Sequence, residues 1–89
     1  MTEINHSEIY NYIKNTLSGN GIKLFSLYKL QDTDRICYGM GLESIENTGV
    51  TTSDIRKHLK NDKYEFSVPG DFTRASGAFL HLEIDVTIL

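Results

Sequence analysis

The sequence of 89 residues contains no tryptophan, one cysteine and one proline. Because a disulfide needs two cysteines, the single Cys37 excludes a bridge within the chain and favours a reducing compartment. The opening residues, MTEINHSEIY, lack the cationic and apolar parts of a signal peptide. No apolar run approaches the roughly 20 residues that cross a bilayer. We therefore expect a cytoplasmic protein with no membrane partner.

An excess of positive charge is also lacking. Lysine and arginine together number 9, against 12 aspartates and glutamates, so the net charge is −3. A basic field over the whole molecule, which would draw it to nucleic acid, is therefore absent, although a local basic patch is compatible with this composition. With 39% apolar and 24% charged residues, the chain has ordinary globular composition. Its length predicts a single domain, residues 1–89.

Residues near the start of the chain predict a first amphipathic helix. Asn5 or Ser7 is suited to cap its beginning, and the glycines and asparagine of SGNG, residues 18–21, are suited to end it. Residues at helical spacing give it one face directed to the core: Ile9, Tyr12, Ile13, Thr16 and Leu17.

A second helix is predicted to begin after residue 50. Thr51 is a favourable N-cap, and Asp54 three residues later completes a capping box. Val50 and Ile55 are placed to contact each other across the cap, and Leu59 follows Ile55 at helical spacing.

Four further segments predict strands, at residues 22–30, 35–42, 63–68 and 78–88. The last alternates most clearly, with Leu82 and Ile84 on one face and His81, Glu83 and Asp85 on the other. The element order α-β-β-α-β-β predicts an α+β fold. We expect a four-stranded, mainly antiparallel sheet with both helices on one face.

The two halves of the chain also predict an internal repeat of residues 4–42 and 50–89. The stretches INHSEIYNYIKN and VTTSDIRKHLKN share capping and core positions, and LFSL at 24–27 is similar to EFSV at 65–68. This alignment places Phe25 in the core and leaves Ile22, Leu24 and Tyr28 as an apolar patch on the opposite face. If the strand register is shifted by one residue, the patch is buried instead.

No group of residues predicts catalysis, a metal site or a cofactor site. His81, Glu83 and Asp85 share one strand face, as a metal site or general base would require, but the solvated side of an amphipathic strand is the favoured explanation for them. A lone cysteine in a strand, such as Cys37, is more often a buried apolar residue than a nucleophile. We therefore expect a protein that is not an enzyme.

The stretch IENTGVTTSDIRKHL, residues 45–59, resembles a helix-turn-helix segment, with Gly49 in the turn and Ile55 in the core. Residues 63–84 then resemble the wing of a winged-helix domain. The stretch departs from the motif at Ile45 and His58, and its second half has a near-copy at the N-terminal helix. The resemblance implies nucleic-acid contacts from five basic residues: Arg56, Lys57, Lys60, Lys63 and Arg74.

The size and the lack of catalytic motifs favour a small non-catalytic binding protein that acts by occupying a macromolecular partner. We expect a protein partner, bound through Ile22, Leu24, Tyr28 and Tyr10. Inhibitors and adaptors are of this kind, including anti-defence proteins of phages and mobile elements. The alternatives are a winged-helix-like DNA-binding module and a self-associating structural module that forms a homodimer.

Overall fold

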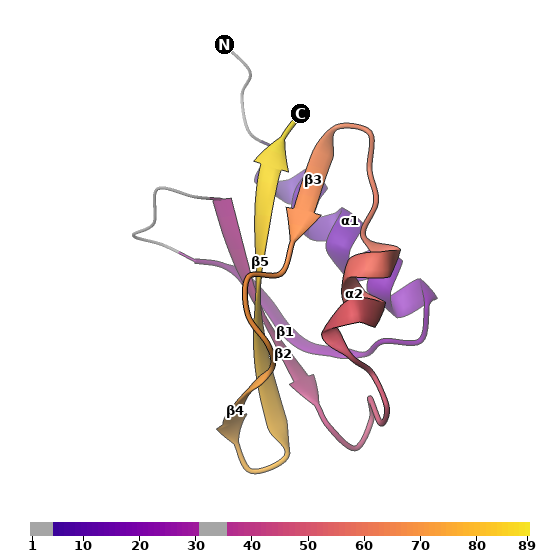
Figure 1. Cartoon of the computed structure of the whole chain (residues 1–89), viewed down its shortest axis with the longest axis vertical. Helices are drawn as coiled ribbons and strands as arrows, with labels where there is room; N and C mark the ends of the chain where they lie inside the picture. The colour runs from indigo at the N-terminus through magenta and orange to yellow at the C-terminus, as the bar shows by residue number, and fades with distance from the viewer. Residues whose placement is uncertain (1–4, 31–35) are drawn as a thin grey trace.

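In the part of the chain that the structure describes, two helices cover one face of a five-stranded antiparallel sheet (Figure 1). The computed structural model describes residues 5–30 and 36–89. The elements are α1 (His6–Gly19), β1 (Leu24–Lys29), β2 (Ile36–Glu43), α2 (Thr52–His58), β3 (Tyr64–Ser67), β4 (Thr73–Ser76) and β5 (Phe79–Ile88). The predicted α+β class is confirmed. Neither helix is long and apolar enough to cross a membrane within the described ranges.

The strand order is β1-β2-β5-β3, and β4 also pairs with β5. The long β5 pairs with β2 along one edge, while its other edge is shared by β4 near Phe79 and β3 near Ile88. The prediction of four strands is therefore wrong. The four-residue β3 pairs only with Asp85 to Ile88 of β5, and β4 pairs with Phe79 to His81 through a turn in which Gly77 has φ of 55°.

The predicted start and end of the first helix and the predicted start of the second are confirmed. The Asn5 side chain caps α1 by accepting a hydrogen bond from the Glu8 N–H at 3.0 Å, and α1 ends before Gly21, which has φ of 81°. In α2, the Thr51 hydroxyl accepts from the Asp54 N–H, and the Asp54 carboxylate accepts from the Thr51 N–H. The pKa of Asp54 lies below its ordinary value because its carboxylate accepts hydrogen bonds from the Thr51 N–H and from the Thr51 hydroxyl, the latter at 3.0 Å.

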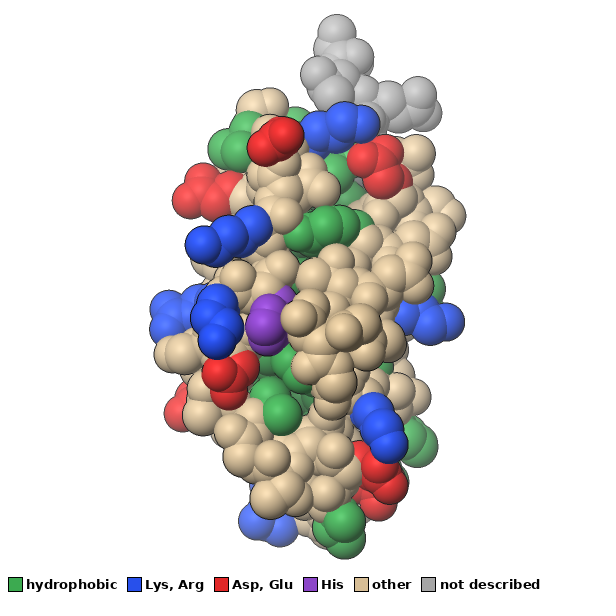
Figure 2. All heavy atoms as spheres, turned by 90° about the vertical axis from the view of Figure 1, so that its right-hand side faces the viewer, with side chains coloured by type: hydrophobic (Ala, Val, Ile, Leu, Met, Phe, Trp, Pro, Cys, Tyr) green, Lys and Arg blue, Asp and Glu red, His purple; other side chains and the backbone are tan. Residues whose placement is uncertain are grey.

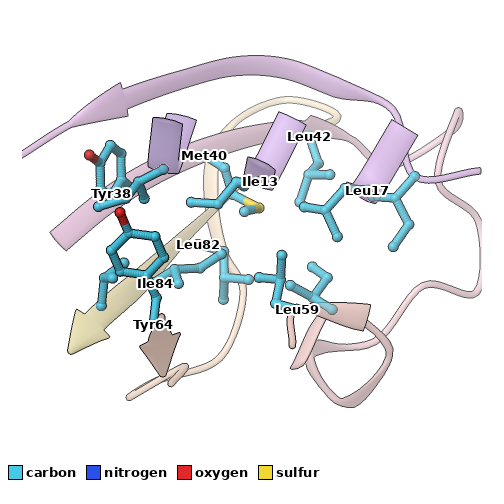
Figure 3. Close-up of a cluster of buried hydrophobic side chains, with 13 residues drawn as sticks. Ile13, Leu17, Tyr38, Met40, Leu42, Leu59, Tyr64, Leu82 and Ile84 are labelled. Atoms are coloured by element: carbon cyan, nitrogen blue, oxygen red, sulfur yellow. The ribbon is translucent and has the colours of Figure 1, made fainter. Parts of the chain in front are cut away.

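The core lies between the sheet and the two helices (Figure 3). Ile13 and Leu17 of α1 meet Met40 and Leu42 of β2, and residues of α2, β3 and β5 also belong to the cluster. The Tyr12 hydroxyl links α1 to the backbone just after α2, since it donates to the Lys60 carbonyl and accepts from the Lys60 N–H at 2.9 Å.

Asn47 is the one polar residue among those buried in the described part of the chain, and it fixes the start of β1. Its side-chain oxygen accepts from the Lys23 N–H at 2.8 Å, and its nitrogen donates to the carbonyls of Lys23 and Glu43, both at 2.9 Å. The loop before α2 is thereby joined to the chain entering the sheet. No sequence pattern pointed to this role.

The predicted faces of β1 are partly wrong. Phe25 is 68% exposed, whereas Ile22 is buried and Leu24 packs against the core. The cause is an irregularity in the β1–β2 pairing: Leu24 pairs with Leu42, but Ser26 pairs with the very next residue, Gly41. The extra residue shifts the alternation, so that Leu24 and Leu27 both contact the core.

The helix-turn-helix interpretation also fails at the level of local structure. Residues 36–43, which would belong to the preceding helix, form β2, and residues 44–49 form turns. The helix α2 has only seven residues and packs its Ile55 into the core beside α1. The geometry that a helix-turn-helix motif needs is therefore missing here.

Candidate functional site

The side of the sheet that faces away from α1 and α2 is here called the outer face. Both helices lie on the same side of the sheet in Figure 1, and no described helix covers the outer face. Strand alternation and pairing assign to it Ser26 and Tyr28 of β1, the odd-numbered residues of β2 and β5, Glu65 and Ser67 of β3, and Thr73 of β4. Phe25, displaced by the irregularity of β1, joins this face.

Two glycines of β2 form the floor of the outer face near β1. The Tyr28 ring lies directly over Gly39, because a Cβ at Gly39 would meet the ring at 2.6 Å. Likewise, a Cβ at Gly41 would meet the Ser26 hydroxyl at 2.6 Å. Glycine at these positions lets side chains of β1 lie flat against the sheet.

Above this floor is a hollow of about 330 Å³, here called the aromatic hollow. At one end the rings of Phe25 and Phe79 are 4.6 Å apart, and at the other end the rings of Tyr28 and His81 stack at 6.1 Å. The Tyr28 hydroxyl is 3.5 Å from Nδ1 of His81. The remaining lining residues are Ser26, Gly41, Ser76 and Leu80.

A second hollow, of about 310 Å³, adjoins the first and is here called the acidic hollow. It is lined by Gly70, Asp71, Thr73, His81 and Glu83. His81 lines both hollows, so the two form one continuous surface. Glu83 and Tyr28 both pair with Gly39, from opposite sides, which places the carboxylate in the same row as the ring.

The two sides of the sheet differ in charge. The strand positions of the outer face, within the described residues, carry four carboxylates and neither lysine nor arginine: Glu43, Glu65, Glu83 and Asp85. The helical side carries charges of both signs: the basic residues are Lys14 and those of α2 and the following loop, and Glu8, Asp54 and Asp62 lie among them. Figure 2 shows this side, on which lysine and arginine side chains are interspersed with aspartate and glutamate side chains. The outer face is therefore acidic and aromatic.

The predicted partner-binding residues do not form one surface. Ile22 is buried, with 2% of its surface exposed, and Leu24 packs against the core, so the expected exposure of this pair is wrong. Tyr28 is 43% exposed and lies on the outer face. Tyr10 is half-buried on α1, across the sheet from Tyr28.

Sequence reasoning missed Phe25 and Phe79 as partners of Tyr28. Phe25 was assigned to the core by its alignment with Phe66, which packs against the core. The glycine pair at Gly39 and Gly41 was the available signal, because two glycines on one strand face leave room for neighbouring side chains. Which side chains occupy that room depends on the pairing with β1.

The five basic residues separate into three groups. Arg56, Lys57 and Lys60 are exposed on α2 or just beyond it. Lys63 lies 3.5 Å from the Glu8 carboxylate in an exposed ion pair. Arg74 is on β4, apart from α2 in Figure 1, and its guanidinium donates to the Gly77 carbonyl at 2.7 Å.

The residues predicted to share a strand face, His81, Glu83 and Asp85, do share the outer face. No group of three or more His, Cys, Asp or Glu suited to a metal ion occurs in residues 5–30 and 36–89.

Comparisons with protein-family models, with curated proteins and with solved structures give no match.

Proposed function

We propose that this chain is a small non-catalytic binding protein that engages a protein partner with the outer face of its sheet. The observation that carries the proposal is the aromatic hollow, where Phe25 and Tyr28 are exposed on a face that no described helix covers. Exposed aromatic rings are favourable when a partner buries them, and they are enriched in protein interfaces.

The form of the surface suits occupation of a partner better than chemistry. Its two hollows are open and continuous, and their walls are rings and carboxylates on an antiparallel sheet. A cytoplasmic inhibitor or adaptor, such as an anti-defence protein of a phage or mobile element, would act in this manner. In the strand order β1-β2-β5-β3, the first strand of each half lies outside and the last strand of each half lies at the centre. This symmetry is compatible with an origin by duplication of residues 4–42 and 50–89.

The test is quantitative affinity capture from a lysate of the source cells with three immobilised proteins. These are the unaltered chain, the outer-face variant Phe25→Ser, and the helical-side variant Lys57→Gln. Both substitutions are at exposed residues, so neither removes a core contact. We expect a protein that the chain and Lys57→Gln retain equally and that Phe25→Ser loses.

A partner lost with Lys57→Gln but kept by Phe25→Ser would overturn the proposal. Sedimentation of the purified chain separates a homodimer from an unrelated partner. If the chain dimerises through the outer face, Phe25→Ser should convert it to a monomer, and the partner is then a second copy.

Nucleic-acid binding is a second candidate, favoured by the adjacent exposed residues Arg56, Lys57 and Lys60. Binding by this route should weaken steeply with salt, since each phosphate contact releases counterions. The variant Arg56→Ala with Lys60→Ala should lower the affinity for any duplex that binds. Equal mobility of duplexes with and without the chain at low salt would exclude this candidate.

A further inference from the structure

We infer that the outer face recognises a basic segment of its partner, with an arginine side chain seated in the aromatic hollow. The inference rests on the proposed function and specifies the chemistry of the occupant. Its motivation is the combination of three aromatic rings, a neighbouring acidic hollow, and the lack of lysine and arginine at the described strand positions of the outer face.

The aromatic hollow is suited to a planar cation. The faces of phenylalanine and tyrosine rings carry negative potential, and a guanidinium group stacks on such faces. The pair Phe25–Phe79 and the pair Tyr28–His81 stand at the two ends of the hollow. An aliphatic side chain would fill the same space, but it would gain nothing from the carboxylates beside it.

The acidic hollow supplies the complementary charge. Glu83 is exposed on the outer face, and Asp71 is exposed in the loop that borders it. A guanidinium donates paired hydrogen bonds to a carboxylate, which lysine cannot match in geometry. No basic side chain lines either hollow apart from His81, so an incoming cation meets little repulsion.

The two hollows together suit an extended segment. They share His81 and therefore adjoin, and alternate side chains of an extended chain point to the same side. Arginines two residues apart would reach the aromatic hollow with one side chain and the acidic hollow with the other. A compact small molecule would use one hollow alone.

The test is a titration of the whole chain, labelled with ¹⁵N, with the blocked peptide acetyl-Ser-Arg-Ser-Arg-Ser-amide. Two peptides of the same length serve as matched controls. In the citrulline peptide, citrulline replaces both arginines and keeps their shape without their charge. In the glutamate peptide, glutamate replaces both arginines. We expect shifts of the amide signals of Tyr28, Gly41, His81 and Glu83. The citrulline peptide should bind about tenfold more weakly than the arginine peptide, a difference within the range of cation–π contacts.

Variants connect the shifts to the hollows. Phe25→Ser and Glu83→Gln should each weaken the arginine peptide about five- to tenfold, while Lys57→Gln on the helical side should leave it unchanged. Equal binding of the arginine and citrulline peptides, shifts confined to α2, or no shifts at all would overturn the inference. The proposed function has a separate readout, because loss of a captured partner with Phe25→Ser would stand even if that partner offers no cation.

Discussion

Gly39 is the residue on which the aromatic hollow most directly depends. A Cβ at this position would lie 2.6 Å from the Tyr28 ring and 2.8 Å from its hydroxyl oxygen. The ring is the exposed end of a flexible side chain, so it can move away more easily than the strands can separate. A methyl group at Gly39 should therefore remove one wall of the hollow and leave the sheet intact.

The prediction is that Gly39→Ala separates Tyr28 from His81 while changing the free energy of unfolding by no more than about 1 kcal/mol. The proton signals of the His81 ring should shift, because a neighbouring aromatic ring no longer stacks on it. Gly19→Ala is the matched control, since an added Cβ there meets no atom within 4 Å. Unchanged His81 signals in Gly39→Ala would contradict the role given to Gly39.

Among the elements, α2 depends most on its cap, because it has only seven residues. Short helices gain little from propagation and rely on their ends and on tertiary packing. Thr51 and Asp54 satisfy N–H groups at the start of α2 reciprocally. We predict that Thr51→Ala lowers the stability by about 1 kcal/mol in urea denaturation. Thr52→Ala, one position further on and outside the capping box, should have a smaller effect.

The stabilising effect of this cap should depend on pH. The pKa of Asp54 is lowered in the folded state, first by the hydrogen bond from the Thr51 N–H and then by that from its hydroxyl. A lowered folded pKa stabilises the fold above the ordinary value of about 3.9, and this contribution is lost as the pH falls through the folded pKa. The difference between the unaltered chain and Thr51→Ala should therefore be smaller in acid than at pH 7. An unchanged difference would contradict the capping box.

The elements also show where the sequence is informative. Asn5, Thr51 and Gly21 act on the backbone within a few residues, so local patterns predicted both helices, the two ends of α1 and the start of α2. The alternation of β5 is uninterrupted, and its faces were predicted for the same reason. By contrast, the displacement of Phe25 and the existence of β4 arise from pairing with strands elsewhere in the chain. Local periodicity carries no information about such pairing.

The candidate site depended on the same missing information. Tyr28 was correctly placed on the face away from the helices, but Ile22 and Leu24 were expected beside it and are not there. The irregularity of β1 turns Ile22 and Leu24 toward the core and places Phe25 beside Tyr28 on the outer face. The second neighbour, Phe79, comes from β5 near the other end of the chain. A repeat alignment by letters cannot detect such an exchange, because Phe25 and Phe66 carry the same letter in opposite environments.

At the scale of the whole molecule, the two halves of the chain share one hydrophobic core. Strands β2 and β5, one from each half, pair at the centre of the sheet and meet both helices through the same buried cluster. Neither half can bury its apolar side chains without the other. The chain should therefore unfold in one cooperative transition, whatever the origin of its two halves.

The substitution Ile84→Ala tests this arrangement, because Ile84 is fully buried at the centre of β5. Truncation of a buried isoleucine to alanine costs about 2–5 kcal/mol, a large part of the roughly 5–10 kcal/mol expected for a domain of this size. Thr87→Ala on the exposed side of the same strand should cost less than about 1 kcal/mol. Urea unfolding should be followed by far-ultraviolet circular dichroism for the backbone and by tyrosine fluorescence for the core.

Both probes should give coincident curves for the unaltered chain, and Ile84→Ala should lower the midpoint of both together. The tyrosines report from both halves, since Tyr12 is in α1, Tyr38 in β2 and Tyr64 in β3. If the halves were independent units, Ile84→Ala would shift only the transition of residues 50–89, and the two probes would separate. That result would contradict a shared core, because residues 4–42 would then remain folded without the pairing of β2 with β5.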